Sequence, residues 1–217
     1  MNTVAIRRLL ARACLPAVLV LLNACAAQPL HFHTLLGTQQ PARSRQAADL
    51  AGDRGGDLAI ELQRVRVPAQ VDHPELVLRA GDGRLLRIED RRWSAPLPDE
   101  VRAALAAALS SQLQVREVSA VVAPGTLPVY RVAVDLQRFD AQLDRAVRVE
   151  AVWSLRRLAS GQESRVWTCA SSSERVAGTG YDALIAAAQQ ALLDIAAQMA
   201  MLISAAQQDA AQAACRS

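Results

Sequence analysis

The clearest structural signal in this chain is the segment Tyr130-Arg131-Val132-Ala133-Val134-Asp135-Leu136-Gln137. Its large apolar side chains alternate with charged or polar ones, which predicts a β-strand with one buried face and one exposed face. Residues 147–156 repeat this alternation, and Ser160-Gly161 then turns the chain into a third strand at residues 165–171. We therefore expect a three-stranded antiparallel meander whose outer face meets water or a partner.

Two further strand regions precede this meander. Residues 58–67 alternate in polarity with a change of phase near Gln63, which indicates a β-bulge, and Pro68 ends the strand. Residues 76–79 and 85–88 flank Asp82-Gly83, a pair that favours a tight hairpin turn with positive φ at both central positions. Together these regions predict a mainly antiparallel sheet.

Two segments have the spacing of amphipathic helices. Pro98, Asp99 and Glu100 are typical of a first helical turn, and an apolar stripe extends that helix over residues 98–113. The second helix covers residues 181–203, and Thr179 with Asp182 resembles a capping box. Core packing of its stripe is favoured over an intermolecular coiled coil, because a two-heptad seam is short. The expected fold class is therefore α+β, with both helices packed on one face of the sheet.

The N-terminus has the layout of a bacterial lipoprotein signal. Three arginines precede an apolar run over residues 15–22, which is too short to span a bilayer comfortably, and the run ends in the lipobox Leu22-Asn23-Ala24-Cys25. We expect cleavage before Cys25 and acylation of its thiol; ordinary secretion and an uncleaved anchor are the alternatives. The chain then divides into a signal peptide (1–24), a lipidated tether with a short strand at 30–36 and a linker (25–57), an α+β domain (58–205) and a C-terminal tail (206–217).

Charge argues against nucleic acid as a partner. The leader arginines account for the whole formal net charge of +3, so the mature chain is formally neutral. Binding to phosphate backbones needs a concentrated positive field, which a neutral domain lacks. The most apolar later stretch runs from Leu184 to Ile203, but three glutamines and Asp194 interrupt it, which indicates an amphipathic helix rather than a membrane span.

Two of the four cysteines have no role in the leader or the anchor. Cys14 lies in the leader and Cys25 is the expected acylation site, which leaves Cys169 and Cys215. In an oxidising envelope compartment such a pair often forms a disulfide. Two independent thiols are the alternative, because a sequence does not show the distance between two residues.

The sequence contains little that indicates catalysis, a metal site or a cofactor. His31 and His33 have strand spacing, but no third ligand with suitable spacing follows, and a closed zinc site needs four ligands. A Gly-x-Ser-x-Gly elbow, a phosphate loop and a Gly-x-Gly-x-x-Gly motif are all missing from the sequence. We therefore expect a protein that is not an enzyme and has no cofactor.

Several short motifs follow one another in a recognisable order. They are the lipobox with the aromatic strand 32–35, Val67-Pro68 with residues 71–79, the Trp-containing segment 92–97, the hairpin segments 138–141 and 149–155, and the Ala-rich helix from Tyr181. This order resembles the ABC-type transport auxiliary lipoproteins, the paraquat-inducible protein C family. The resemblance covers most of the mature chain.

The resemblance implies a non-catalytic accessory in lipid transport between the two membranes. The implied partners are a substrate-binding protein of the mammalian cell entry type and its permease or a paraquat-inducible membrane protein. Ala26, which follows the expected acylated cysteine, is not aspartate, and this implies the periplasmic face of the outer membrane. A mature lipoprotein with several acyl chains would be anchored stably there. The neutral body and the long helical seam are compatible with a homo-oligomer.

Two sets of residues are candidates for the partner interface. Trp93 is either a hydrophobic plug beneath the hairpin–helix junction or an interface anchor. Arginines on one sheet face form either a docking surface or a solvated face: Arg131, Arg148, Arg156 and Arg165.

Three other functions compete with this interpretation. The first is an envelope assembly lipoprotein that supports the insertion of lipopolysaccharide or outer-membrane proteins. The second is a periplasmic hydrolase, which would need a nucleophile–base pair that the sequence does not reveal. The third is binding of a lipid between the sheet and the long Ala-rich helix.

Overall fold

The computed structural model describes residues 29–37, 58–118, 128–158 and 165–215. The expected signal peptide, the acylation site Cys25, most of the linker and the Ser160-Gly161 turn lie outside these ranges. The chain divides into two units, Met1–Leu30 and His31–Ser217, and all helices and strands described below belong to the second.

A five-stranded sheet forms the centre of this unit. Its strands in spatial order are β5 (Arg116–Glu117), β2 (Ala59–Leu62), β6 (Val129–Gln142), β7 (Ala146–Leu158) and β8 (Val166–Val176). β6, β7 and β8 pair antiparallel, which confirms the predicted meander. β2, in contrast, runs parallel to both of its neighbours, so the sheet is mixed.

A second sheet has three strands in the order β1 (His31–His33), β4 (Leu85–Trp93) and β3 (Glu75–Arg79). β3 and β4 form the predicted hairpin, and β1 runs parallel to β4. The α+β class is confirmed, but the expectation of one mainly antiparallel sheet is corrected to two mixed sheets. All three parallel pairs join segments that are distant in sequence, and alternation within a single strand carries no information on such pairing.

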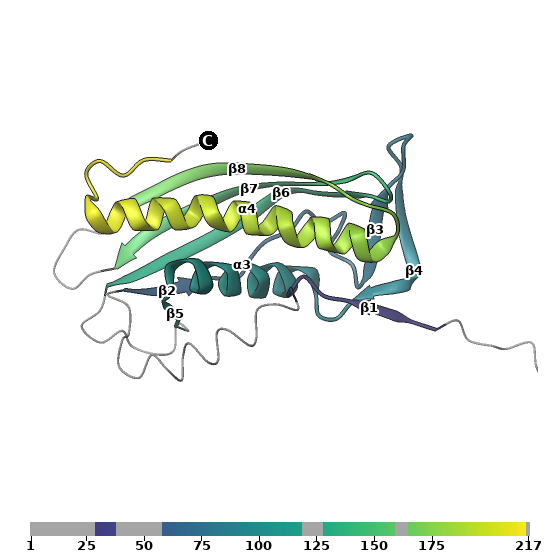
Figure 1. The fold of residues 1–217 in the computed structure, drawn as a ribbon, viewed down its shortest axis with the longest axis horizontal. Coiled ribbons are helices and arrows are strands. Elements are labelled where there is room, and N and C mark those ends of the chain that lie inside the picture. The colour runs from purple at the N-terminus through teal and green to yellow at the C-terminus, as the bar shows by residue number, and fades with distance from the viewer. Residues whose placement is uncertain (1–28, 38–57, 119–127, 159–164, 216–217) are drawn as a thin grey trace, which may run out of the picture. The chain divides into compact units, whose positions relative to one another are not determined.

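Two helices cover one face of the five-stranded sheet, as predicted (Figure 1). They are α3 (Leu97–Leu113) and α4 (Tyr181–Gln208). α4 packs mainly on β7 and β8, and α3 lies beside it over β2 and β5. The inward side chains of β7 fill the space beneath, and Val147, Val149 and Leu155 are completely buried. This packing of an apolar sheet face under two apolar helix stripes is the main hydrophobic core.

The start of α4 differs from the capping-box prediction. Its N-cap residue is Gly180, with φ of 87°, and no side chain caps the helix. The Gly180 N–H donates instead to Asp144 Oδ1, at 2.7 Å. The left-handed backbone of Gly180 turns the chain sharply from β8 into α4. The contact with Asp144, in the turn between β6 and β7, takes the place of the expected Thr179–Asp182 capping box.

α4 also extends beyond the predicted end of the domain at residue 205. It continues to Gln208 and is followed by a short segment in which Ala213 is buried. The most apolar 18-residue window of α4 has a mean hydropathy of 1.3, which is enough for a membrane span by length and composition. Half of that window is buried within the fold, as expected for a core helix.

Asp194 interrupts the apolar sequence of α4 because it binds the adjacent strand. Its carboxylate accepts hydrogen bonds from Arg175 and Ser173 of β8 and from Gln190. Burial raises the pKa of Asp194, but these hydrogen bonds together outweigh burial and hold the pKa below its usual value. The charged carboxylate therefore attaches α4 to the edge strand of the sheet.

The strand predicted over residues 58–67 is shorter than expected. β2 ends at Leu62, and only Arg66 resumes pairing, through a bridge to Asp135. Glu61, a polar residue between the apolar Ile60 and Leu62, is buried beside Arg131 of β6, its partner in the register. The Arg131 guanidinium donates to both oxygens of this carboxylate at 3.0–3.1 Å, which compensates for the loss of water.

The β3–β4 turn also differs in detail from the prediction. The Gly83 N–H donates to Ala80 O at 2.9 Å, and the Ala80 N–H donates to Arg84 O at 2.8 Å. Gly83 has φ of 89°, whereas Asp82 does not have positive φ. The turn is therefore a longer loop that ends in a left-handed glycine, not a two-residue turn with two such positions.

Candidate functional site: the open face of the five-stranded sheet

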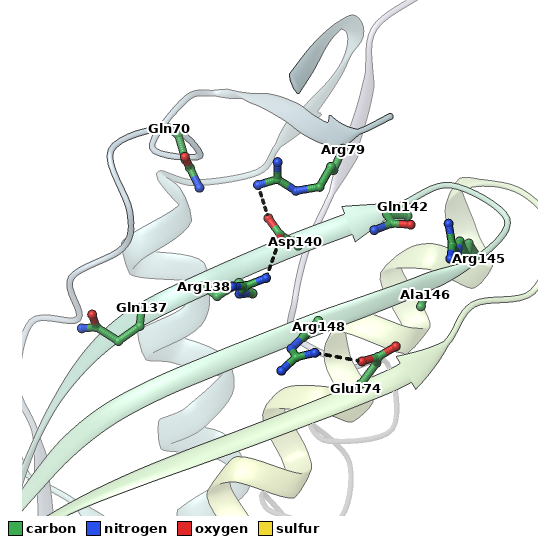
Figure 2. Close-up of a pocket in the computed structure, with 10 residues that line it drawn as sticks. All are labelled: Gln70, Arg79, Gln137, Arg138, Asp140, Gln142, Arg145, Ala146, Arg148 and Glu174. Carbon is green, nitrogen blue, oxygen red and sulfur yellow. Dashed lines mark hydrogen bonds and ion pairs between the residues drawn. The ribbon is translucent and has the colours of Figure 1, made fainter. Parts of the chain in front are cut away.

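The face of β6, β7 and β8 that lies opposite the helices carries two adjacent hollows, the first of which is drawn in Figure 2. The first has a volume of about 540 Å³ and is lined mainly by long polar side chains: Gln70, Arg79, Gln137, Arg138, Asp140, Gln142, Arg145, Arg148 and Glu174. The second has a volume of about 510 Å³ and shares Gln137 with the first. No described helix covers this face, so its concave surface is available to a partner.

A β-bulge in β6 creates the floor of the first hollow. Residues 130, 132, 134 and 136 face the helices, but the register shifts between Leu136 and Arg138, with Gln137 as the extra residue. A one-residue shift exchanges the two faces of a strand. Arg138 and Asp140 therefore lie on the open face, while Phe139 points into the core. Without this bulge, two charged side chains would be directed into the hydrophobic core.

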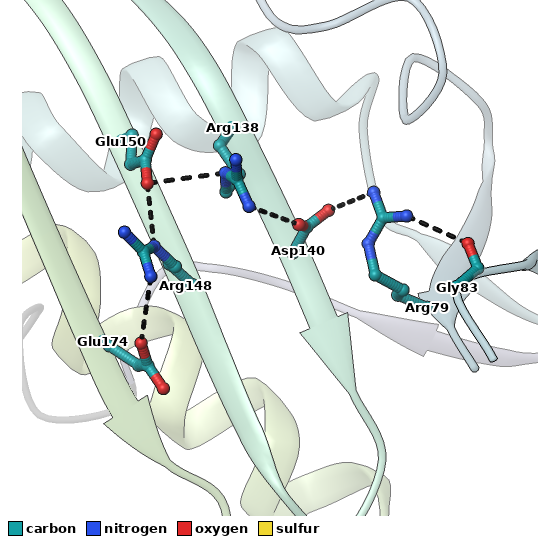
Figure 3. A network of polar contacts seen from close by, with 7 residues as sticks. All are labelled: Arg79, Gly83, Arg138, Asp140, Arg148, Glu150 and Glu174. Atoms are coloured by element: carbon teal, nitrogen blue, oxygen red, sulfur yellow. Dashed lines mark hydrogen bonds and ion pairs between the residues drawn. The ribbon is translucent and has the colours of Figure 1, made fainter. Parts of the chain in front are cut away.

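Six charged side chains form a continuous network across this floor (Figure 3). Arg79 reaches from β3 to Asp140 at 2.8 Å and also donates to Gly83 O at 3.0 Å. Arg138 lies between Asp140 and Glu150, 3.4 Å from each. Arg148 continues the network to Glu150 at 2.7 Å and to Glu174 at 3.6 Å. Positive and negative groups alternate, so the network is formally neutral.

Asp140 is the group that holds this network to the fold. It is only 7% exposed, and the guanidinium of Arg79 covers it from the second sheet. The hydrogen bond that Arg79 donates to Asp140 raises the pKa of Arg79 above its usual value. Removal of Arg79 would leave the buried Asp140 with only the longer contact to Arg138, so the Arg79–Asp140 pair keeps the β3–β4 hairpin attached to β6.

The second hollow has smaller and less charged walls. Ala133, Ser154 and Thr168 lie beside Val152, which is 39% exposed at the centre of the open face. An ion pair between Arg66 and Asp135, at 2.6 Å, borders it. A surface with a small apolar centre and a polar rim is the usual composition of a non-obligate protein interface.

The structure separates the two arginines predicted for the interface. Arg131 and Arg148 both lie on the open face, but Arg131 pairs in register with Arg156, whereas Arg148 is eight positions earlier on β7. That spacing corresponds to roughly 27 Å along an antiparallel strand. Arg131 is bound to Glu61, and Arg148 belongs to the charged network. Arg165 lies 5.6 Å from the centre of the Trp167 ring.

Trp93 lies in the core, in agreement with its interpretation as a hydrophobic plug. It is buried at the end of β4, and its ring meets Phe139 edge-on with 6.2 Å between centroids. Leu184, Ile185 and Ala188 of α4 complete its surroundings. A side chain in this position stabilises the contact between the two sheets and α4, and its burial does not support a direct partner contact.

Cys169 and Cys215 are joined by a disulfide, with 5.6 Å between their Cα atoms. Cys169 is buried on the helix-covered face of β8, and Cys215 follows α4 in the C-terminal segment. Trp167 Nε1 also donates to Ala213 O in this segment, at 3.0 Å. Residues 209–215 are therefore fastened to β8 rather than forming a free tail.

Sequence reasoning missed the buried carboxylates that organise the fold. Glu61, Glu100 and Asp140 are all buried, and each binds a group at least 60 positions away. A sequence signal existed for Asp140 alone. The alternation of residues 130–136 changes phase before Phe139, and that change indicates the bulge.

In the ranges that the structure describes, no group of three or more His, Cys, Asp and Glu side chains is placed to hold a metal ion. His31 is exposed on β1, and His33 is half-buried. Burial, and secondly the charge of Arg91, lowers the pKa of the His33 imidazole. His31 and His33 therefore belong to the β1–β4 surface. The residues that line the two hollows of the open sheet face include no histidine.

Comparison with known proteins identifies the family. Residues 34–200 match the family described as the ABC-type transport auxiliary lipoprotein component. One similar structure is the crystal structure of an uncharacterized protein, which is 21% identical in sequence and gives a TM-score of 0.58. The match covers 81% of this chain and 99% of that chain. Another is that of a Xanthomonas campestris protein: 17% identity, TM-score 0.53, and 74% and 93% covered.

No match was found among curated proteins. At such low identity, the two crystal structures support the fold alone, whereas the family match covers most of the described domain. This chain belongs to the ABC-type transport auxiliary lipoprotein family.

Proposed function

We propose that this protein is a non-catalytic accessory of an intermembrane lipid transport system of the ABC and mammalian cell entry type. Cys25 carries the acyl chains that anchor it to the periplasmic face of the outer membrane. The domain docks onto the transport assembly through the open face of β6, β7 and β8. Family membership supports the transport role, and the uncovered sheet face with its two hollows is the structural observation that carries the docking proposal.

The partition of the sheet into two different faces favours docking on the open one. The inner face is filled by α3 and α4, and the cavity beside Trp93 and Leu184 has a volume of only about 10 Å³. That volume does not accommodate a lipid acyl chain, so this described space does not favour the alternative in which lipid binds between the sheet and α4. The open face is concave, rigid and polar at its rim, which suits a reversible protein contact.

The proposed partner is a substrate-binding protein of the mammalian cell entry type, together with its permease or a paraquat-inducible membrane protein. The charged network is internally neutral, so it adds no strong long-range attraction for either charge sign. We therefore expect recognition to depend on shape and on contacts near Val152, with the surrounding charges setting the register of the partner.

Cross-linking in intact membranes followed by purification of this protein tests the proposal. We expect the mammalian-cell-entry-type protein or its permease among the recovered proteins. The Val152→Arg variant should recover at least about tenfold less of it, which corresponds to about 1.4 kcal/mol of lost binding energy. Asp135, the register partner of Val152, can pair with the new guanidinium, so the domain should still fold.

Met201→Arg is the matched control. Met201 is 52% exposed on α4, on the opposite side of the domain, and the same charge there should leave recovery unchanged. Equal recovery with both variants would refute docking through the open face. Recovery of a β-barrel assembly protein in place of any transport component would instead favour the envelope assembly function.

A further inference from the structure

The strand nearest the expected anchor carries the one exposed aromatic side chain of the protein. The chain has three Trp, two Tyr and two Phe, and all of them lie within the described ranges. Phe32 is 63% exposed, whereas every other aromatic side chain is buried or half-buried. Phe32 is therefore the exception among the aromatic side chains of this protein.

Phe32 is held rigidly by the fold. β1 pairs with β4 over its whole length, with Phe32 opposite Arg92, and the Ser94 N–H donates to His33 O at 2.8 Å. The following residues are fixed as well, because Thr34 Oγ1 and the Leu35 N–H both donate to Glu100. The exposed ring therefore belongs to the domain surface and keeps a defined orientation relative to it.

The expected anchor lies close to this ring along the chain. Seven positions separate Cys25 from Phe32, and a fully extended chain covers at most about 3.6 Å per residue, or about 25 Å in total. An acyl anchor at Cys25 therefore keeps Phe32 at a high effective concentration near the membrane surface. When the anchor holds Phe32 near the membrane in this way, even weak partitioning of one aromatic ring into the bilayer is enough to orient the domain.

The charges around Phe32 are already neutralised. Arg92 pairs with Glu75 at 3.4 Å, and Arg91 pairs with Asp90 at 3.4 Å while lying over the ring of Tyr181. A surface that attracted anionic headgroups would need unpaired cations, so the attraction here is apolar. An aromatic ring with polar groups beside it suits the boundary between headgroups and acyl chains.

We propose that Phe32 inserts into the interfacial layer of the membrane that holds Cys25, so that the domain rests on the bilayer through the β1–β4 surface. This inference rests on the proposed anchoring at Cys25. It goes beyond anchoring because it assigns a second, non-covalent contact and a fixed orientation of the domain. The occupant of this surface is the lipid bilayer rather than a partner protein.

Tryptophan fluorescence in vesicles tests this contact. The Phe32→Trp variant, acylated and purified as the full mature chain, is incorporated into phosphatidylcholine vesicles whose acyl chains carry bromine. The native tryptophans are buried, so bromine atoms should quench them little. We expect the emission added by Trp at position 32 to be quenched, and to be shifted to shorter wavelength relative to the same variant in solution.

Val166→Trp is the control for non-specific contact. Val166 is also partly exposed but begins β8, at the end of the sheet opposite the β3–β4 hairpin (Figure 1). Its added emission should not be quenched. Equal quenching at positions 32 and 166, or none at either, would overturn the inference. Intact mass spectrometry distinguishes failure of the membrane contact from failure of the anchor. A sample that carries no fatty acid on Cys25 refutes the anchor, and the inference about Phe32 fails with it before any vesicle is added.

Discussion

At the scale of single residues, a buried carboxylate connects the N-terminal segment to the helices. Glu100 is 5% exposed in the first turn of α3, and its Oε2 accepts from Thr34 Oγ1 at 2.7 Å and from the Leu35 N–H at 2.8 Å. Gln189 of α4 donates to Thr34 O at 3.1 Å. These contacts fasten residues 34 and 35 to both helices.

We expect Glu100→Ala to destabilise the domain by about 1–3 kcal/mol, because the buried Leu35 N–H then has no acceptor. Urea unfolding followed by circular dichroism measures the change. Asp99→Ala is the matched control, since Asp99 lies in the same helical turn but is exposed, and its loss should cost at most about 1 kcal/mol. An equal effect of the two substitutions would show that Glu100 acts only through the helix dipole.

The pattern around Asp99 and Glu100 correctly predicted the start of a helix, but not the partner of Glu100. The propensity of acidic residues for a first helical turn is local, and it is the same for an exposed and a buried carboxylate. The Leu35 contact joins residues 65 positions apart, and only the tertiary structure brings them together. The same holds for the Glu61–Arg131 pair, whose residues are 70 positions apart.

At the scale of secondary-structure elements, strand alternation and helix spacing were sufficient for most of the fold. The meander, the β3–β4 hairpin and both helices lie where they were predicted. The errors occur at ends and turns, where competing local solutions differ little in energy. The capping residue of α4 is one example, and the length of the β3–β4 turn is another.

The β3–β4 turn provides a test at this scale. We expect Gly83→Ala to destabilise the domain by roughly 1–2 kcal/mol, because a Cβ disfavours the left-handed backbone that Gly83 adopts. Thermal unfolding measures the effect. A Cβ at Gly83 would meet no atom within 4 Å, so the cost comes from backbone conformation and not from a steric clash.

Gly81→Ala is the control within the same loop. A Cβ there also meets no atom within 4 Å, but Gly81 does not have positive φ. Its substitution should change the free energy of unfolding by less than about 1 kcal/mol in either direction. A larger loss for Gly81→Ala than for Gly83→Ala would contradict the turn conformation described above.

At the scale of the whole molecule, the disulfide connects the end of the chain to the edge of the five-stranded sheet. Cys169 and Cys215 are 46 positions apart, and the loop between them contains all of α4. Cross-linking restricts the unfolded chain, so loss of the bond through a Cys169→Ala/Cys215→Ala double substitution should cost about 2–4 kcal/mol. Urea unfolding of the parent and the double variant measures this difference.

Mass spectrometry under non-reducing conditions provides an independent check of the disulfide. Treatment of the folded parent protein with an alkylating reagent should modify neither Cys169 nor Cys215 until a reductant is added. Modification of both cysteines without reductant would contradict the bond. The reduced protein should also expose the Trp167 side chain, because the segment that contains Ala213 is no longer held against β8.

Local sequence was enough to specify the meander, the hairpin, the two helices and the apolar face that they share. Each of these depends on neighbours within a few positions, and the periods of strands and helices are properties of the backbone itself. The family resemblance followed from the order of the same local motifs.

The tertiary structure alone decided which strands run parallel, which charges are buried and which face stays open. These features join positions that are tens of residues apart, and their free energies come from burial and charge pairing that exist only after the chain has packed. The bulge at Gln137 illustrates the difference. The change of phase that it causes is visible in the sequence, but only the packing between the two sheets brings Asp140 and Arg138 beneath Arg79.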